Sequence, residues 1–269
     1  MEASFALHDS SLQPVPATTV VDPTIDNATM LFNGAGRPVM PNFNAIKAIV
    51  PLDRFKANWN ALTQRSFDAL GPADWNNIVV AGGAVLHCLM PNFHPSQRPN
   101  TDIDLFIYGL NAVQARAKVE RLFDLISSTP GCTGNKSVMA LRTPNTVTFV
   151  LPAPKKHIQI VLRLHFSADE VISCFDVDCC GVMYDGVEVR ATTRAAKAIA
   201  TRVNIAVAER RSWTYESRLI KYAKRGYAIA VPGLDMTKVD RDSYISERDD
   251  SRWWSPDEAI DQYFEATGL

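Results

Sequence analysis

The sequence predicts an α+β fold, in which short strands and helices alternate along one domain that follows an extended N-terminal arm. Apolar residues recur at helical spacing in some segments and gather in short β-rich runs in others. The chain has 269 residues, of which 46% are hydrophobic and 21% charged, so one large domain is expected and a wholly disordered chain is excluded. Residues 1–50 carry little charge and several prolines, which is typical of an extended arm.

The composition also narrows the class of protein. No run of about 18 apolar residues predicts a membrane span, and the N-terminus lacks the pattern of a secretory signal. The five cysteines include no C-x-x-C pair, which indicates reduced, mostly buried thiols of an intracellular protein. The formal charge of −1 argues against bulk electrostatic binding of nucleic acid. However, residues 189–227 carry +8 and residues 235–269 carry −6.

The first predicted elements of the domain are a helix, a strand and a short helix. Apolar residues recur at three- and four-residue spacing from Pro51 until Gly71-Pro72 ends the pattern. Residues 77–81 form a short apolar run that predicts a buried strand. Gly82-Gly83 then opens a short helix that continues through Met90.

A longer strand and helix follow. Polar and apolar residues alternate at the start of 102–108, which predicts a strand, and 111–127 has the pattern of an amphipathic helix. Three β-rich runs come next, over residues 137–141, 146–151 and 157–165.

The last part of the chain is predicted to be mainly helical. Ser167 caps a helix that ends near Cys174, because Glu170 occupies the capping-box position. Residues 176–184 are expected to form a strand, and Asp185-Gly186 is a hairpin turn. Three further helices are expected over residues 192–202, where Thr192 or Thr193 is the cap, 214–225 and 256–266.

Two aspartates form the first candidate site. On a strand, Asp102 and Asp104 lie on the same face, because side chains alternate with period two. Two carboxylates on one face repel unless a cation lies between them, and Mg²⁺ takes one or two carboxylates together with phosphate oxygens. Gly82-Gly83 allows the backbone to approach a phosphate closely.

A second pair of aspartates could complete this site. If residues 176–184 form a strand, Asp176 and Asp178 also share one face and could supply a third carboxylate. Alternatively, this pair forms a salt-bridge network with Arg163 or Arg194.

A helix in the basic segment carries cations on one face. Arg218, Lys221 and Arg225 recur at three- and four-residue spacing, and could meet a triphosphate or a nucleic-acid backbone. The alternatives are a solvated surface or neutralisation of the acidic tail.

The order of these motifs resembles a known family. Ala81-Gly82-Gly83-Ala84, followed by Asp102-Ile-Asp104 and a later aspartate on a strand, resembles the nucleotidyltransferase superfamily typified by DNA polymerase β. Later segments resemble a poorly characterised branch found in fungi and large viruses, often beside ankyrin repeats. These segments are Ile158-Gln-Ile-Val-Leu-Arg163, Phe175-Asp-Val-Asp178, Tyr184-Asp-Gly186 and Tyr215–Gly226.

The resemblance implies a nucleotidyltransferase-like mixed β-sheet flanked by helices, with a helical C-terminal part. It covers about residues 75–235 and does not include the arm. The expected organisation is therefore an arm over 1–50, a nucleotidyltransferase-like domain over 51–235, and an acidic tail with a terminal helix over 236–269.

The resemblance also implies an activity, the Mg²⁺- or Mn²⁺-dependent transfer of a nucleoside monophosphate from an NTP to a hydroxyl acceptor. Asp102, Asp104 and Asp176 would bind the metal, and Asp176 or Asp178 would help to deprotonate the attacking hydroxyl. The nucleotide would be bound by residues of two segments, Gly82 and Gly83 in the first and Arg218, Lys221 and Arg225 in the second.

Two residues depart from the family pattern. Ala84 stands where a serine or threonine usually contacts phosphate, and Gln159 lies in the strand that often carries the third carboxylate. These departures favour an alternative, a catalytically impaired accessory protein of a larger assembly such as a viral particle, held by its N-terminal arm. The expected partners are an NTP, a hydroxyl acceptor and further copies of the chain, with nucleic acid as another candidate and no membrane. The expected location is the cytoplasm, or within or on a viral particle.

The remaining potential metal ligands show no pattern. Cys179-Cys180 lacks a second cysteine or histidine pair at ligand spacing, so buried packing is expected. The histidines at 87, 94, 157 and 165 are scattered, and no metal or catalytic role is predicted for them.

Overall fold

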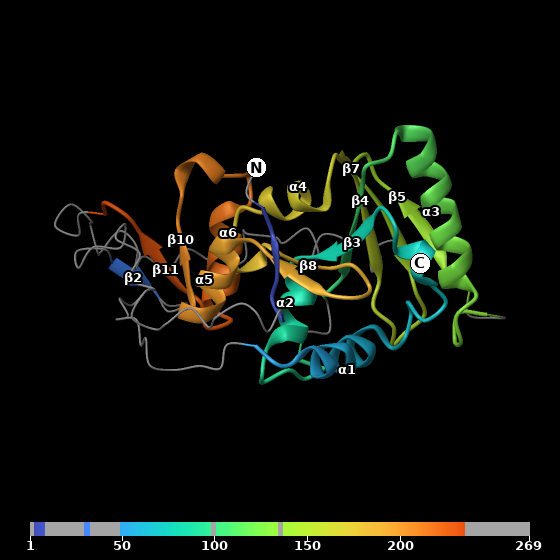
Figure 1. The fold of residues 1–269 in the computed structure, drawn as a ribbon, viewed down its shortest axis with the longest axis horizontal. Helices are drawn as coiled ribbons and strands as arrows, with labels where there is room; N and C mark the ends of the chain where they lie inside the picture. The colour runs from blue at the N-terminus through green and yellow to red at the C-terminus, as the bar shows by residue number, and fades with distance from the viewer. Residues whose placement is uncertain (1–2, 9–29, 33–48, 98–100, 134–136, 235–269) are drawn as a thin grey trace, which may run out of the picture. The chain divides into compact units, whose positions relative to one another are not determined.

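An eight-stranded mixed β-sheet is the largest element of the computed structural model, which describes residues 3–8, 30–32, 49–97, 101–133 and 137–234 (Figure 1). Apart from the last two, the described residues belong to one unit that spans residues 1–232. Most of the predicted arm and of the acidic tail, including the expected helix 256–266, lies outside the described residues.

The order of strands in this sheet is β1 (Phe5–Ala6), β9 (Val189–Ala191), β8 (Val182–Tyr184), β3 (Ile78–Ala81), β4 (Ile103–Tyr108), β7 (Ile158–His165), β6 (Thr146–Val150) and β5 (Met139–Arg142). Strands β4 and β7 pair in parallel, and the other neighbours are antiparallel. The predicted mixed sheet is therefore confirmed, and the described start of the arm pairs with β9 of the same chain.

A second, smaller sheet was not predicted. It contains β10 (Val203–Ile205), β11 (Ala228–Val231) and β2 (Met30–Phe32). Strands β10 and β11 pair in parallel, whereas β2 pairs antiparallel with β11. Each strand is three or four residues long, too short for a periodic signal in the sequence.

The helices follow the predicted pattern closely. They are α1 (Leu52–Thr63), α2 (Gly83–Leu89), α3 (Ala112–Ser127), α4 (Ala168–Ser173), α5 (Thr193–Thr201) and α6 (Tyr215–Ala223). The caps explain their starts, since the side chains of Asn111, Ser167 and Thr192 each accept a hydrogen bond from a backbone amide of the first helical turn. None of the helices in the described ranges is long and apolar enough to cross a membrane.

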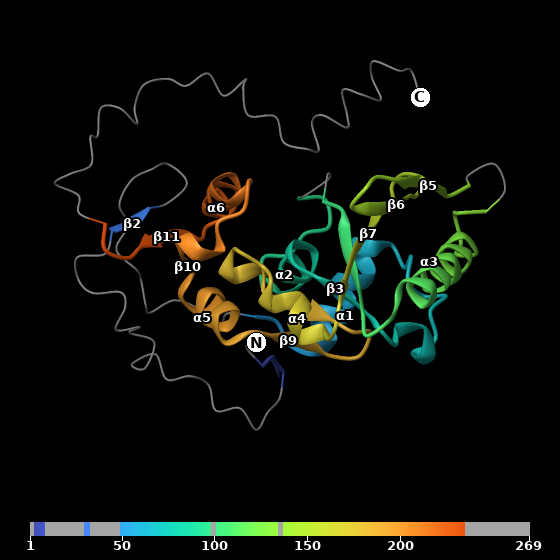
Figure 2. The same ribbon diagram turned by 90° about the horizontal axis from the view of Figure 1, so that it is seen from above.

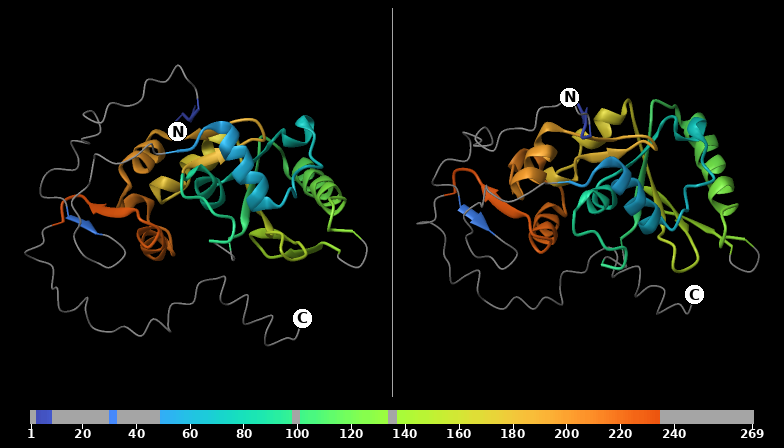
Figure 3. Two further views of the ribbon diagram at one scale, coloured as in Figure 1. Left: turned by 90° about the horizontal axis from the view of Figure 1, so that it is seen from below. Right: turned by 60° about the horizontal axis from the view of Figure 1, so that its bottom comes forward.

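Helices cover both faces of the sheet. In β4, Ile103, Leu105 and Ile107 are buried in the main core, to which α1, α2 and α3 contribute. The alternate residues Phe106 and Tyr108 pack instead in a smaller core with residues of α4. Figure 1 shows α4 on one side of β3 and β4, with α1 and α2 on the other, and Figures 2 and 3 show the same arrangement from above and below.

One predicted strand is largely wrong. Residues 176–184 form a strand only at Val182–Tyr184, whereas Asp178–Cys180 form a 3₁₀ turn. Long-range hydrogen bonds hold this turn, because the Asn204 side chain accepts from the amide of Cys179 (2.9 Å) and Asp178 accepts from the amide of Ile205 (2.8 Å). Asp176 and Asp178 therefore do not share a strand face.

Candidate functional site

The double glycine lies where the chain leaves β3 and enters α2. Gly82 has a φ of +82°, a conformation that glycine adopts without strain. A Cβ atom at this position would lie 2.9 Å from Cε1 of Phe175, so space also favours glycine. The amide of Gly82 donates to the carbonyl of Val182 (3.0 Å), so contacts with a phosphate would fall to Gly83 and the residues after it.

The pairing of β3 with β4 brings the glycines close to the first pair of aspartates. The strands are antiparallel and Val80 pairs with Leu105, so Gly82-Gly83 lies beside the start of β4. Asp104 belongs to β4 and Asp102 directly precedes it, and both are half-buried. Alternation along the strand puts both carboxylates on the face that α4 covers. Two elements of the predicted site thus meet at one end of the sheet.

The neighbouring strand supplies no carboxylate at this point. Gln159 of β7 pairs with Asp104 in the parallel register, so an amide occupies the adjacent position. Lys156 precedes β7, and its pKa is lowered by burial while the charge of Asp102 opposes that shift. A protein cation therefore lies within electrostatic reach of Asp102.

Asp178 is held in a buried ion-pair network. Its side chain is only 4% exposed, and Oδ1 accepts from Nη1 of Arg194 (3.0 Å) and Nη1 of Arg210 (2.7 Å). Oδ2 accepts from the amide of Ile205 (2.8 Å). The predicted pairing with Arg194 is confirmed, and both carboxylate oxygens have protein donors.

Asp176 has a similar environment. Oδ1 accepts from the amide of Val177 (2.9 Å), and Oδ2 accepts from the Ser212 hydroxyl (2.9 Å). Nη2 of Arg218 lies 2.9 Å from the same Oδ2. Arg218, predicted to meet a nucleotide, thus contacts the aspartate predicted as the third metal ligand. The catalytic roles of Asp176 and Asp178 stay predictions.

The other two predicted cations of α6 differ from each other. Lys221 is exposed on the surface. Arg225 lies over the ring of Tyr222, with 5.0 Å between the guanidinium carbon and the ring centroid. Its Nη1 would be 3.9 Å from a Cβ atom at Gly83. The structure therefore brings Gly83 and Arg225 together from segments far apart in the sequence.

Arg225 also lines a cavity of about 430 Å³. Arg202 is a second cation in its wall, and donates through Nη1 to the Tyr227 hydroxyl (3.1 Å). Burial raises the pKa of Tyr227, so this phenol stays protonated. The other lining residues come from the end of α2, the following loop and the end of α6: Leu86, His87, Met90, Pro91, Asn92, Gln97 and Gly226. Two arginines in one wall suit an anionic ligand.

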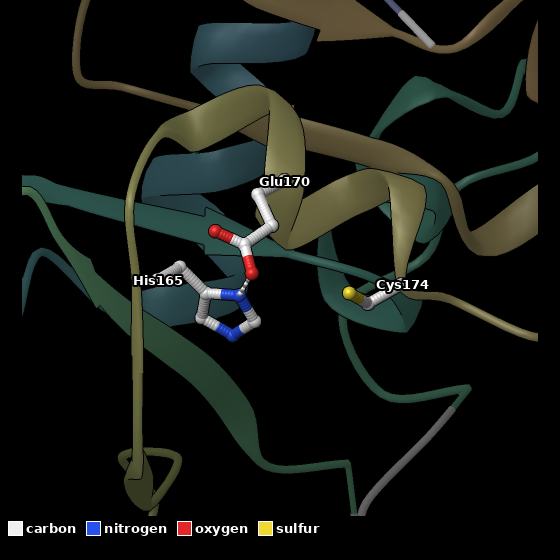
Figure 4. A group of neighbouring side chains, drawn as sticks. All are labelled: His165, Glu170 and Cys174. Atoms are coloured by element: carbon white, nitrogen blue, oxygen red, sulfur yellow. Dashed lines mark ion pairs between the residues drawn. The ribbon is translucent and has the colours of Figure 1, made fainter. Parts of the chain in front are cut away.

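A cluster of three potential metal ligands was not predicted from the sequence. His165, Glu170 and Cys174 offer ligand atoms that all lie within 4.8 Å of one another (Figure 4). Within the described ranges, the predicted metal ligands do not form a comparable group of three. The sequence spacing could have predicted this cluster. Glu170 and Cys174 are four residues apart, which puts them on one face of the predicted helix, and His165 lies at the end of the preceding strand.

Known proteins similar to this chain were found by structure and by sequence. A solved structure of a CCA-adding enzyme in complex with CTP has a TM-score of 0.36 and 12% identity, over 65% of this chain and 44% of that one. The uncharacterized protein R883 of Acanthamoeba polyphaga mimivirus is 31% identical over 199 residues, which cover 70% of this chain and 42% of the relative. The chain thus spans less than half the length of this curated relative. Residues 53–202, more than half of the chain, match the family described as Gabija anti-defense 2 family protein. The chain belongs to the Gabija anti-defense 2 family.

Proposed function

We propose that the chain is a divergent nucleotidyltransferase, which binds a nucleoside triphosphate with a divalent cation and transfers the nucleoside monophosphate to a hydroxyl acceptor. The observation that carries this proposal is the β3–β4 register, which aligns Gly82-Gly83 with Asp102 and Asp104 at one end of the sheet. The two motifs come from neighbouring strands, and their proximity supports a shared role in binding a metal–triphosphate complex.

The donor set fits a hard cation. Asp102 and Asp104 offer carboxylate oxygens on one face, and the amide of Gln159 is adjacent. Mg²⁺ commonly takes one or two carboxylates and completes its coordination with water and phosphate oxygens. Bound there, it would neutralise charge on the phosphates.

The cationic side of the site would be supplied by Arg225. This guanidinium is next to Gly83 and lines the cavity with Arg202. The cavity volume of about 430 Å³ lies within the usual range for small-molecule sites. Arg225 would contact the phosphates, and the cavity would hold another part of the nucleotide.

A second candidate is a catalytically impaired protein that keeps the fold and serves a larger assembly. Gln159 beside Asp104 favours this candidate, and so do the arginines that already contact both aspartates predicted to supply the third carboxylate, Asp176 and Asp178. The family description supports a role in countering a defence system. We include that role in both versions of the proposal.

The decisive experiment is nucleotide transfer by the full chain. The purified protein would be incubated with each labelled NTP and Mg²⁺ or Mn²⁺, with candidate protein and nucleic-acid acceptors. We expect labelling that is lost in Asp102→Asn/Asp104→Asn and kept in Asp124→Asn, a matched change at an exposed aspartate of α3. Unchanged labelling in the double variant would exclude this site as the catalytic centre.

Calorimetric titration with a non-hydrolysable triphosphate separates the two candidates. Binding that requires Mg²⁺ and Asp102, without transfer to any acceptor, would favour the impaired protein. Absence of both binding and transfer would overturn both versions.

A further inference from the structure

His165, Glu170 and Cys174 form a cluster outside the site described above. His165 is the last residue of β7, Glu170 lies in α4, and Cys174 is the C-cap of α4. Figure 4 shows the Glu170 carboxylate and the Cys174 sulfur on the side of the imidazole that carries Nδ1. One nitrogen, one oxygen and one sulfur therefore face a common point.

The histidine is buried without a hydrogen-bond partner for this nitrogen. His165 is 4% exposed, and its Nδ1 makes no hydrogen bond. Oε1 of Glu170 lies 3.6 Å from it, which is close enough for an ion pair with a protonated imidazole but beyond hydrogen-bond distance (Figure 4). A buried polar atom without a partner destabilises a fold, so this nitrogen points to a missing ligand.

The carboxylate is already oriented for binding. Oε2 of Glu170 accepts from the amide of Phe166 (2.6 Å), which leaves Oε1 directed at the imidazole. Such an outer hydrogen bond is characteristic of metal-binding carboxylates.

We infer that His165, Glu170 and Cys174 bind a zinc ion. The set combines nitrogen, oxygen and thiolate ligands, a mixture that Zn²⁺ accepts and that hard cations such as Mg²⁺ do not prefer. Ligand atoms around tetrahedral zinc are about 3.5 Å apart, so the cluster would contract by about 1 Å through side-chain rotation. The Cys174 thiol would lose its proton to solvent on binding.

A catalytic thiol is the competing explanation for these residues. A cysteine–histidine–carboxylate relay uses one ring nitrogen for the thiol and the other for the carboxylate. Here the carboxylate and the sulfur are both on the Nδ1 side (Figure 4), as a shared ion requires. Because Cys174 is exposed, the fourth coordination position would be open to water or to a further ligand.

The site would tie the end of β7 to α4, which covers the face of the sheet that carries Asp104. It does not depend on nucleotide transfer. The test uses the full chain, stripped with a chelator and titrated with Co²⁺ as a spectroscopic substitute and with Zn²⁺. We expect one ion per chain and a thiolate-to-cobalt absorption band in the near ultraviolet. In Cys174→Ser, the band should vanish and the affinity for zinc should fall at least about tenfold.

The control is Cys132→Ser, which removes a buried cysteine and should keep both the band and the affinity. Glu170→Gln should weaken binding of zinc in a chain whose circular dichroism is unchanged. A second measurement is alkylation of Cys174 by iodoacetamide, which zinc should slow. Failure to bind Co²⁺ or Zn²⁺, binding that survives Cys174→Ser, or alkylation indifferent to zinc would each overturn the inference.

Discussion

Within the part of the chain that the structure describes, two Asp-x-Asp pairs have identical spacing and different surroundings. Asp102 and Asp104 are half-buried on and before a strand, beside the double glycine, with an amide at the paired position. Asp176 and Asp178 are buried in a loop and a 3₁₀ turn, and arginines contact both. The first pair lies beside the double glycine and near one lysine, Lys156, whereas arginines contact each aspartate of the second pair directly.

This difference teaches that spacing alone does not define a metal site. An external ion competes with the protein cations that already contact a carboxylate, and breaking a buried ion pair is costly. At Asp178, both oxygens accept bonds from protein donors, and an ion would have to displace Arg194 and Arg210. The following predictions test this division, from the largest expected effect to the smallest.

The largest effect is expected for Asp178→Ala. The change leaves Arg194 and Arg210 without their shared partner, and should lower the free energy of unfolding by about 3–5 kcal/mol, as measured by urea denaturation. Asp124→Ala, at an exposed position, should change it by less than about 0.5 kcal/mol. A loss as small as that of the control would remove the distinction between the two pairs.

A smaller effect is expected for Arg218→Ala. Asp176 would keep its bonds from Ser212 and Val177, and the Arg218 side chain is 41% exposed, so the expected loss is about 1–2 kcal/mol. Lys221→Ala, on the exposed surface of the same helix, is the control and should be close to neutral. If Arg218→Ala abolished nucleotide binding without loss of stability, its predicted contact with the nucleotide would be favoured instead.

Gln159→Asp tests whether the first pair, Asp102 and Asp104, binds a metal ion. The variant adds a carboxylate beside Asp104. Without metal, repulsion should lower the free energy of unfolding by up to about 1 kcal/mol. Added Mg²⁺ should restore the stability, and its affinity should rise by roughly tenfold because the charge of the ligand set increases. The control is Gln159→Asn, whose new side chain has the size of aspartate but no charge, and which should show neither effect. Equal Mg²⁺ affinity in the two variants would argue against a metal at this end of the sheet.

A third aspartate, Asp185, affects stability at high pH through the neighbouring Tyr184. Asp185 accepts hydrogen bonds from backbone amides, and its charge adds to burial in raising the pKa of Tyr184 from 10.0 to about 12. Because the unfolded chain loses this proton first, the stabilisation is complete below pH 10 and is lost as pH rises toward 12. Urea denaturation across this range should show the loss.

Two variants check this assignment. Tyr184→Phe should reduce the loss of stability between pH 10 and 12, to which the other buried tyrosines also contribute, and Asp185→Asn should narrow the pH range over which Tyr184 contributes. Both variants should unfold cooperatively near pH 7, because Tyr184 of the unaltered chain is protonated there in the folded and the unfolded state. An unchanged alkaline profile in Tyr184→Phe would assign the loss to another group.

Much of the fold could be predicted because its signals are local. The start of α3 follows from Asn111 and Gln114, and the start of α4 from Ser167 and Glu170, pairs only three residues apart. The end of β3 at Gly82 follows from a conformation that glycine favours. The stretch 176–184 differs from the predicted strand, because its partners Asn204 and Ile205 are more than twenty residues away.

The sequence by itself therefore determined the helices and their caps, most strands of the large sheet, and the shared face of Asp102 and Asp104. Periodicity and backbone preference act within a few residues, so the local sequence is sufficient for them. Only the tertiary structure decided that arginines neutralise Asp176 and Asp178, that Arg225 reaches Gly83, and that His165 meets Glu170 and Cys174. Charge and coordination depend on which distant segments the fold brings within a few ångströms, and local patterns carry no information about those distances.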